Sequence, residues 1–248
     1  IMNDTNIKWA LITGGSKRIG AKMAETLHDA GINIAIHFNS SSDSAAELCA
    51  QLNAKRADSS ITLKADLTNQ EALEHLVPSL IEQTRRLDVL INNASTFYPT
   101  PIQSITLTDW DDLMGTNLKA PLFLCKYAAE HLKKSSGVII NIIDIHAKKP
   151  LKDHPIYGSA KAGLATLTRS LAKDLAPDVR VNGISPGLIL WPEDEPPEDI
   201  KNNILEQIPL KNPGTPEDIA QCALFLIQDA PYATGQIIAV DGGRSIGW

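Results

Sequence analysis

Tyr157 and Lys161 are the first residues in this sequence whose types and spacing could do chemistry. They lie four residues apart in a stretch of helical periodicity, so their side chains would share one helix face. A free phenol has a pKa near 10, and a unit charge about 4 Å away contributes roughly 4 kcal/mol at an effective dielectric of about 20. That is about three pKa units, which would bring the phenol close to neutral pH as a general acid. Such pairs also occur on ordinary helix faces, so the pair alone decides nothing.

Asp144 is the second candidate, a lone carboxylate directly after the apolar run at 138–143. A carboxylate can relay protons to a phenol and accept hydrogen bonds from ring N–H and amino groups. It would repel the oxyanion that develops when a ketone is reduced. The alternative is that Asp144 only caps the following loop through backbone N–H groups.

A glycine-rich turn comes between a short apolar strand at 9–12 and a helix that closes at Gly31. The turn carries Gly14 and Gly20, and Ile19 opens the apolar spacing of the helix. A strand, a glycine turn and a helix N-terminus together favour phosphate binding. A plain strand-to-helix turn is the alternative.

The end of the second strand predicts which dinucleotide binds. An NAD-dependent enzyme usually has an acidic residue there to bind the ribose 2′-hydroxyl. This chain instead has donors and no carboxylate, with two cations in the glycine turn opposite. The residues concerned are His37, Phe38, Asn39, Ser40 and Ser41, facing Lys17 and Arg18. The pattern predicts NADPH.

The strands are short apolar runs that alternate with helices along the whole chain, without linker or repeat. We expect strands near 9–12, 33–38, 61–63, 89–91, 138–143, 180–184 and 236–240. One helix would open with a capping box at Ser44–Glu47 and run to about Lys55, and another would span about 69–85. This predicts a single α/β domain with a Rossmann-type, doubly wound parallel sheet. Residues 8–115 would form mainly the cofactor half, and 116–248 mainly the catalytic and substrate half.

The polar candidates all follow strands. Gly14, Asp66, Asn93, Asp144 and Pro186 each stand just past a strand end. Because ligands bind at the carboxyl ends of strands in such sheets, we expect these residues along one edge.

Composition excludes several classes of protein. A net charge of −6 argues against a nucleic-acid or anionic-membrane surface. The first six residues lack a signal peptide's apolar core, no apolar run reaches spanning length, and the six histidines lack metal-ligand spacing. We expect a cytoplasmic protein with no metal site. The acidic, proline-rich stretch 191–199 is either a solvated loop or a lid over the ligand edge.

Taken in order, these motifs resemble the short-chain dehydrogenase/reductase family over essentially the whole chain. The matching marks are Thr13-Gly14…Gly20, Asp66, Asn92-Asn93-Ala94, Asn117, Tyr157…Lys161, Pro186-Gly187 and Asp241-Gly242-Gly243. The resemblance implies a nicotinamide-dependent oxidoreductase and, commonly, a homotetramer. Tyr157 would be the proton donor, Lys161 would bind the nicotinamide ribose and lower the pKa of Tyr157, and Asn117 would anchor a water chain behind Lys161. Further cofactor contacts would come from Gly14, Ser16, Ile19, Asp66, Leu67, Asn93, Ala94, Pro186, Gly187 and Leu188.

Three departures from the family pattern resemble its pteridine reductase branch. Arg18 replaces the usual second glycine, Ser95 replaces the glycine after Asn-Asn-Ala, and Asp144 stands where the family places a serine. By this resemblance Phe97 would stack on a pterin ring, and Arg18 and Ser95 would contact both cofactor phosphates and pterin. Trp191 would also line the substrate site. Phe97 could instead be core packing, and Arg18 could serve phosphate alone.

The sequence therefore predicts an NADPH-dependent pteridine reductase that reduces 7,8-dihydropterins to tetrahydropterins. Such an enzyme would act in tetrahydrobiopterin and folate metabolism, with dihydrofolate and oxidised pterins as open substrates. One alternative is a carbonyl reductase of the same fold acting on a ketone or 3-oxoacyl group. The other is a non-catalytic NADPH-sensing protein.

Overall fold

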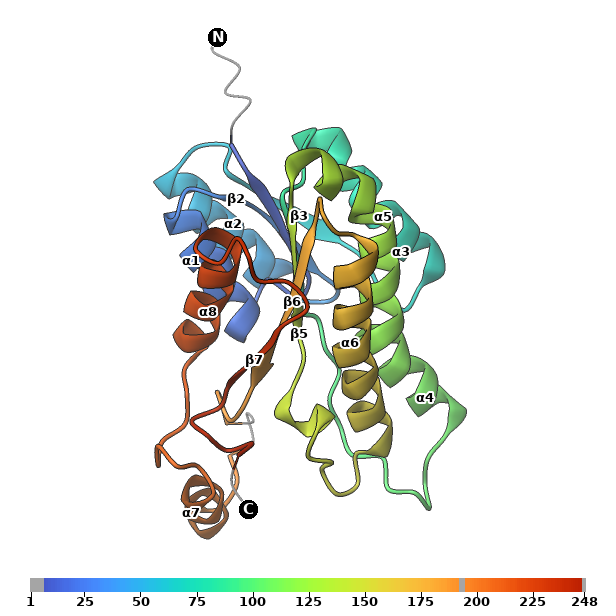
Figure 1. The fold of residues 1–248 in the computed structure, drawn as a ribbon, viewed down its shortest axis with the longest axis vertical. Coiled ribbons are helices and arrows are strands. Elements are labelled where there is room, and N and C mark those ends of the chain that lie inside the picture. The colour runs from blue at the N-terminus through green and yellow to red at the C-terminus, as the bar shows by residue number, and fades with distance from the viewer. Residues whose placement is uncertain (1–6, 192–194, 247–248) are drawn as a thin grey trace.

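A parallel sheet of seven strands forms the middle layer of the structure, a computed structural model that describes residues 7–191 and 195–246 (Figure 1). The strand order is β3-β2-β1-β4-β5-β6-β7, so the chain reverses its direction across the sheet between β1 and β4. The strands are β1 (Trp9–Ile12), β2 (Asn33–Phe38), β3 (Ser60–Lys64), β4 (Val89–Asn92), β5 (Val138–Ile142), β6 (Arg180–Pro186) and β7 (Ile237–Val240). The predicted doubly wound α/β fold is confirmed.

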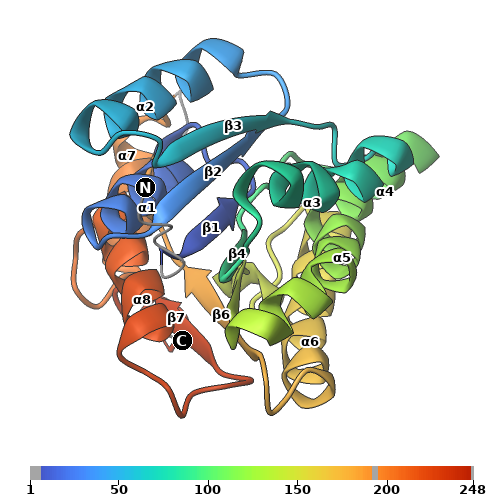
Figure 2. The same ribbon diagram turned by 90° about the horizontal axis from the view of Figure 1, so that it is seen from above.

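Helices cover both faces of the sheet, as Figure 2 shows from above. One face carries α1 (Arg18–Asp29), α2 (Ser42–Lys55) and α8 (Pro216–Gln228), which pack with one side of the strands into a single apolar cluster. The other face carries α3 (Gln70–Thr84) and α5 (Ala120–Ser135), whose leucines join a second cluster. Helix α6 (Pro155–Asp174) lies beside α5 on that same face.

The strands are apolar on both sides because both sides are covered. Every residue of β2, β4 and β5 is buried, which accounts for their continuous apolar runs without alternation. Strand β7 pairs only with β6 at the end of the sheet and is half-exposed.

Of two predicted helix ends, the one at Gly31 is confirmed and the one at Ser44 is not. Gly31 does close α1: it has a φ of 89°, and its N–H donates to the carbonyl of His28, while Ile32 donates to Leu27. The predicted capping box at Ser44 is wrong. Helix α2 begins two residues earlier, at Ser42, so Ser44 lies inside its first turn and cannot be the cap.

Two smaller helices lie beside the carboxyl edge of the sheet. Helix α4 (Leu107–Met114) precedes α5, with a π-helical turn (Gly115–Lys119) between them. Helix α7 (Glu198–Glu206) lies at the bottom of the view in Figure 1 and buries none of its residues. The predicted loop at 191–199 falls partly outside the described residues, and the predicted polar start at 1–6 lies wholly outside them. Within the described ranges, no helix is long and apolar enough to cross a membrane.

Candidate active site

The carboxyl edge of the sheet gathers the predicted polar residues. Gly14 follows β1, Asn93 follows β4 and Asp144 follows β5, while Pro186 ends β6. These strands are neighbours in the sheet, so the residues meet at its lower edge in Figure 1.

Tyr157 and Asp144 are in direct contact. The Tyr157 hydroxyl donates to Oδ2 of Asp144 at 2.7 Å, and Oδ1 of the same carboxylate accepts the backbone N–H of His146 at 2.8 Å. Asp144 thus caps the short 3₁₀ turn (Ile145–Ala147) and bonds the candidate acid with its other oxygen. The two interpretations drawn from the sequence are therefore compatible.

Lys161 lies one turn further along α6 and is buried. Its Nζ donates to the carbonyl of Ile142 at 3.0 Å and lies 5.7 Å from the centroid of the Tyr157 ring. Burial lowers the pKa of Lys161 to about 8, although the negative charge of Asp144 acts to raise it.

The expected lowering of the Tyr157 pKa is wrong for this structure. Burial raises the pKa of Tyr157, the charge of Asp144 and its hydrogen bond raise it further, and the Ser95 hydroxyl only partly opposes them. The predicted lowering depended on the lysine charge alone, whereas the carboxylate in contact with the phenol acts in the opposite direction. Tyr157 is therefore held protonated at neutral pH.

Asn117 sits in the π-helical turn, completely buried. Pro121 has no N–H to offer the Asn117 carbonyl, and the Ala120 N–H donates to Gly115, five residues back. The Asn117 side chain accepts from the Ser95 hydroxyl at 2.6 Å and donates to the Thr96 carbonyl at 3.0 Å. It therefore fixes the loop after β4, a role that the sequence did not indicate.

The glycine turn is shaped as a dinucleotide-phosphate site requires. Gly14 has a φ of 59°, and a Cβ on it would lie 3.1 Å from the Cα of Ala94. A Cβ on Gly20 would lie 2.2 Å from the Gly14 carbonyl oxygen, so the first turn of α1 packs directly on the loop. Asn93 donates to the carbonyls of Thr13 and Gly14. These contacts leave the N-terminus of α1 at the ligand edge, and the residues present fit a nicotinamide dinucleotide.

His37 holds the glycine turn through a hydrogen bond to Gly14. It is buried; its Nδ1 accepts the Gly14 N–H at 3.1 Å, and its Nε2 lies 3.0 Å from the Ala65 carbonyl. This pattern requires the neutral imidazole with its proton on Nε2, and burial lowers the pKa of His37 to about 4. The prediction that His37 and Phe38 face the 2′-phosphate is corrected: both side chains are buried at the end of β2, and His37 holds the glycine turn.

The remaining donors predicted for the 2′-phosphate are accessible. Asn39 and Ser40 are exposed and Ser41 is half-buried, while Lys17 and Arg18 are exposed at the start of α1. Arg18 has a φ of 52°, a left-handed conformation at the place where the family usually has a glycine.

The other predicted cofactor positions line the same edge with differing exposure. Asp66 accepts from the N–H and hydroxyl of Thr68, which lower its pKa. A Cβ on Gly187 would lie 2.6 Å from Cβ of Asp241, so β6 and β7 approach closely there. Leu67 is buried, whereas Ser16, Ile19, Ala94 and Leu188 are half-buried.

Phe97 is exposed over 54% of its side chain, so it is not core packing. Its ring stacks on His154, with centroids 4.7 Å apart and planes 16° apart. It meets Tyr157 nearly edge-to-face, at 4.8 Å and 77°. Sequence analysis missed His154, which lies three residues before Tyr157. Trp191 is half-buried, and the Lys201 ammonium lies 5.8 Å from its ring centroid.

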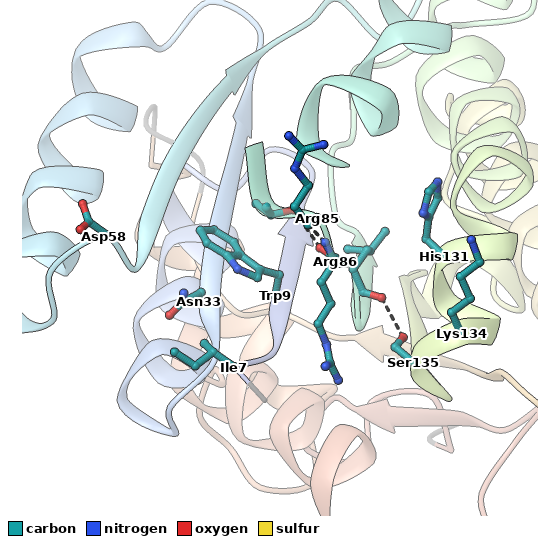
Figure 3. Close-up of a pocket in the computed structure, with 11 residues that line it drawn as sticks. Ile7, Trp9, Asn33, Asp58, Arg85, Arg86, His131, Lys134 and Ser135 are labelled. Atoms are coloured by element: carbon teal, nitrogen blue, oxygen red, sulfur yellow. Dashed lines mark hydrogen bonds between the residues drawn. The ribbon is translucent and has the colours of Figure 1, made fainter. Parts of the chain in front are cut away.

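A cleft of about 1150 Å³ begins at Ile145, the residue after Asp144. It is lined by the 3₁₀ turn, the loop after it, the end of α7 and Arg244. A separate pocket of about 520 Å³ lies at the opposite, amino-terminal edge of the sheet, around Trp9 and Arg86 (Figure 3). No predicted site residue lines that second pocket.

Comparisons with known proteins identify the family of the chain. A family profile described as enoyl-(acyl carrier protein) reductase matches residues 14–245. Pteridine reductase 1 of Leishmania tarentolae is 35% identical, over 96% of this chain and 96% of that protein. A 3-oxoacyl-(acyl-carrier-protein) reductase of Staphylococcus epidermidis is 34% identical, over 95% of this chain and 98% of that protein. One from Synechocystis is 34% identical, over 94% and 95% respectively.

Proposed function

The chain belongs to the short-chain dehydrogenase/reductase family, and we propose that it is an NADPH-dependent pteridine reductase. Members of this family are nicotinamide-dependent oxidoreductases. The relatives described above include a pteridine reductase and 3-oxoacyl reductases at nearly equal identity, so the choice between substrates rests on the site residues.

The Tyr157–Asp144 hydrogen bond is the observation that carries the proposal. Reduction of a ketone builds negative charge on an oxygen, and a carboxylate next to the proton donor would destabilise that charge. A dihydropterin offers ring N–H and amino donors instead, and its reduction leaves a nitrogen to protonate. A carboxylate 2.7 Å from the phenol matches the second substrate better than the first.

Asp144 also supplies a route for the proton. Tyr157 has a single hydroxyl proton, which it donates to Asp144 in this structure. If Asp144 takes up a proton from solvent, it can donate to the phenolic oxygen while Tyr157 donates its own proton to the ring nitrogen. The high pKa of Tyr157 fits this relay, because the phenol is restored to its protonated form at once.

Phe97 contributes the binding surface for a flat substrate. Its exposed ring already forms a stack with His154 and borders Tyr157. A pterin ring placed beside Phe97 would lie within reach of the Tyr157–Asp144 pair, and stacking on an aromatic side chain suits a planar heterocycle.

NADPH, when bound, supplies the hydride for the ring carbon next to that nitrogen. Lys161 would hold its nicotinamide ribose, and the N-terminus of α1 with Lys17 and Arg18 would hold its phosphates. Two electrons and a proton from NADPH, as hydride, with one further proton from Tyr157, convert the dihydropterin to the tetrahydropterin.

The loss of NADPH absorbance tests the proposal directly. We expect it with dihydrobiopterin, little or none with an acetoacetyl thioester, and none without substrate. Turnover of the thioester with none of the pterin would favour the carbonyl reductase. A protein that binds NADPH but turns over neither would be the sensing protein.

A further inference from the structure

Arg244 lines the 1150 Å³ cleft beside Asp144 and is half-buried there. Among the residues that the structure describes, its guanidinium has no hydrogen-bond or ion-pair partner. A cation withdrawn from water without an acceptor is costly, so partly buried arginines normally have one.

The carboxylates of Asp144 and Asp241 act electrostatically on Arg244 but do not accept a hydrogen bond from it. Asp144 and Asp241 both attract the guanidinium electrostatically, although burial lowers the pKa of Arg244. Asp241 accepts the N–H groups of Gly243 and Ser245, and Asp144 accepts from His146 and Tyr157. Both are engaged with other donors, and the five N–H donors of Arg244 remain available to the cleft.

The backbone fixes where Arg244 stands. Gly242 and Gly243 have φ values of 61° and 86° and form a turn directly after β7. A Cβ on Gly242 would lie 2.7 Å from Ile208, and one on Gly243 would lie 2.9 Å from Pro209. This turn therefore packs tightly against the segment after α7, and the next residue, Arg244, is held at the cleft.

The rest of the cleft is mainly basic. Lys149 and Lys211 line it together with His146, against one carboxylate, Glu206. Lys149 donates to the Arg244 carbonyl at 3.4 Å. Lys211 donates to the Glu206 carbonyl at 2.7 Å, which leaves further N–H donors on its ammonium group.

We propose that this cleft is a subsite for an anionic substituent of the substrate, a carboxylate or phosphate group held by Arg244 with Lys211 at its rim. The inference rests on the proposed function in that the reacting ring would lie at Tyr157 and Asp144. It names the substrate class more closely: a ring with a negatively charged tail. Arginine suits this role because its planar fork binds either anion through paired hydrogen bonds.

Pairs of probes that differ in tail charge test the subsite. Dihydrofolate carries carboxylates and dihydrobiopterin does not; acetoacetyl-coenzyme A carries phosphates and acetoacetyl-N-acetylcysteamine does not. Calorimetric dissociation constants would be measured for each probe with the NADP⁺-loaded protein, and kcat/KM with NADPH wherever turnover occurs. The charged member of at least one pair should bind at least about tenfold more tightly, and added salt should reduce that ratio.

Arg244→Gln should lower the ratio about tenfold, and Lys211→Gln should lower it less. If a substitution also disturbs Asp144, it changes the affinity for both members of a pair equally, and this change cancels in the ratio. Arg85→Gln, which removes an exposed arginine at the opposite edge of the sheet, should leave it unchanged. Equal affinity for both members of each pair in the unmutated protein, or a ratio unaffected by Arg244→Gln and Lys211→Gln, would overturn the subsite. Selectivity for the charged thioester without pterin turnover would instead refute the pterin proposal and retain the subsite.

Discussion

The Tyr157 hydroxyl donates a 2.7 Å hydrogen bond to a carboxylate oxygen of Asp144, the residue thirteen positions earlier in the chain. A phenol so placed keeps its proton at neutral pH, since burial and the neighbouring charge both raise its pKa. The proposed acid is therefore a neutral tyrosine hydrogen-bonded to a carboxylate, and each partner can be tested separately.

Tyr157→Phe should remove turnover while keeping the ring that borders Phe97. General acid catalysis contributes about 10²–10⁴-fold, so kcat with a dihydropterin should fall by that factor. NADPH affinity, followed by fluorescence titration, should stay within about twofold because no cofactor-specific charge changes. Retention of normal kcat would show that Tyr157 is an ordinary helix residue.

Asp144→Asn should lower kcat/KM for a dihydropterin at least tenfold, about 1.4 kcal/mol of transition-state stabilisation. The amide oxygen can still accept the His146 N–H, so the melting temperature should hold. Asp144→Ser should also impair pterin reduction, yet it should preserve or create weak ketone reduction. If Asp144 only caps its turn, both variants would keep unchanged activity per folded molecule.

His37 predicts a loss of stability in acid. Its pKa is about 4 in the folded protein, against 6.5 for a histidine in the unfolded chain, so between these pH values the unfolded chain binds more protons. The free energy of unfolding should therefore fall as pH drops from about 6.5 towards about 4. Protonation of His37 in the folded protein would also take away the acceptor of the Gly14 N–H, so NADPH affinity should weaken as the pH approaches about 4.

Urea unfolding of the unmutated protein and of His37→Gln, each at several pH values, would measure this contribution. The glutamine variant should show a shallower loss on acidification. His28, whose pKa burial also lowers, is present in both proteins and cancels in the difference. Parallel pH profiles would contradict the assignment to His37.

The end of β2 predicts a preference for NADPH. Asn39 and Ser40 are exposed there, close after the last strand residue, and neither repels a 2′-phosphate. We expect kcat/KM for NADPH to exceed that for NADH at least tenfold, which corresponds to about 1.4 kcal/mol. Ser40→Asp would add the missing carboxylate and should reduce that preference at least tenfold. Ser42→Asp, at the first residue of α2, serves as the control. Comparable kcat/KM for both cofactors in the unmutated protein would refute the assignment.

The sequence predicted the fold well because its signals are local. Each buried strand is a short apolar run, and Gly31 ends α1 where the left-handed conformation is needed. The strand ends also predicted one ligand edge, since parallel strands present their carboxyl ends together.

The errors at the site are of another kind, because they depend on contacts between distant residues. His37 contacts a turn 23 residues away, and Asn117 bonds Ser95 across 22 residues. The effect of Asp144 on Tyr157 required the two side chains to be seen within hydrogen-bond distance. The sequence did not indicate Arg244, because the lack of an acceptor for its guanidinium can be seen only in the folded structure.

The packing of α1 against α8 has a consequence for synthesis of the protein on the ribosome. Met23 and Leu27 of α1 share an apolar cluster with Ile219, Ala223 and other residues of α8, nearly 200 positions later. The side of α1 that packs on α8 therefore stays uncovered until α8 has been synthesised. A nascent chain that stops before α8 would expose that face, so premature termination should yield an aggregation-prone product rather than a cofactor-binding fragment.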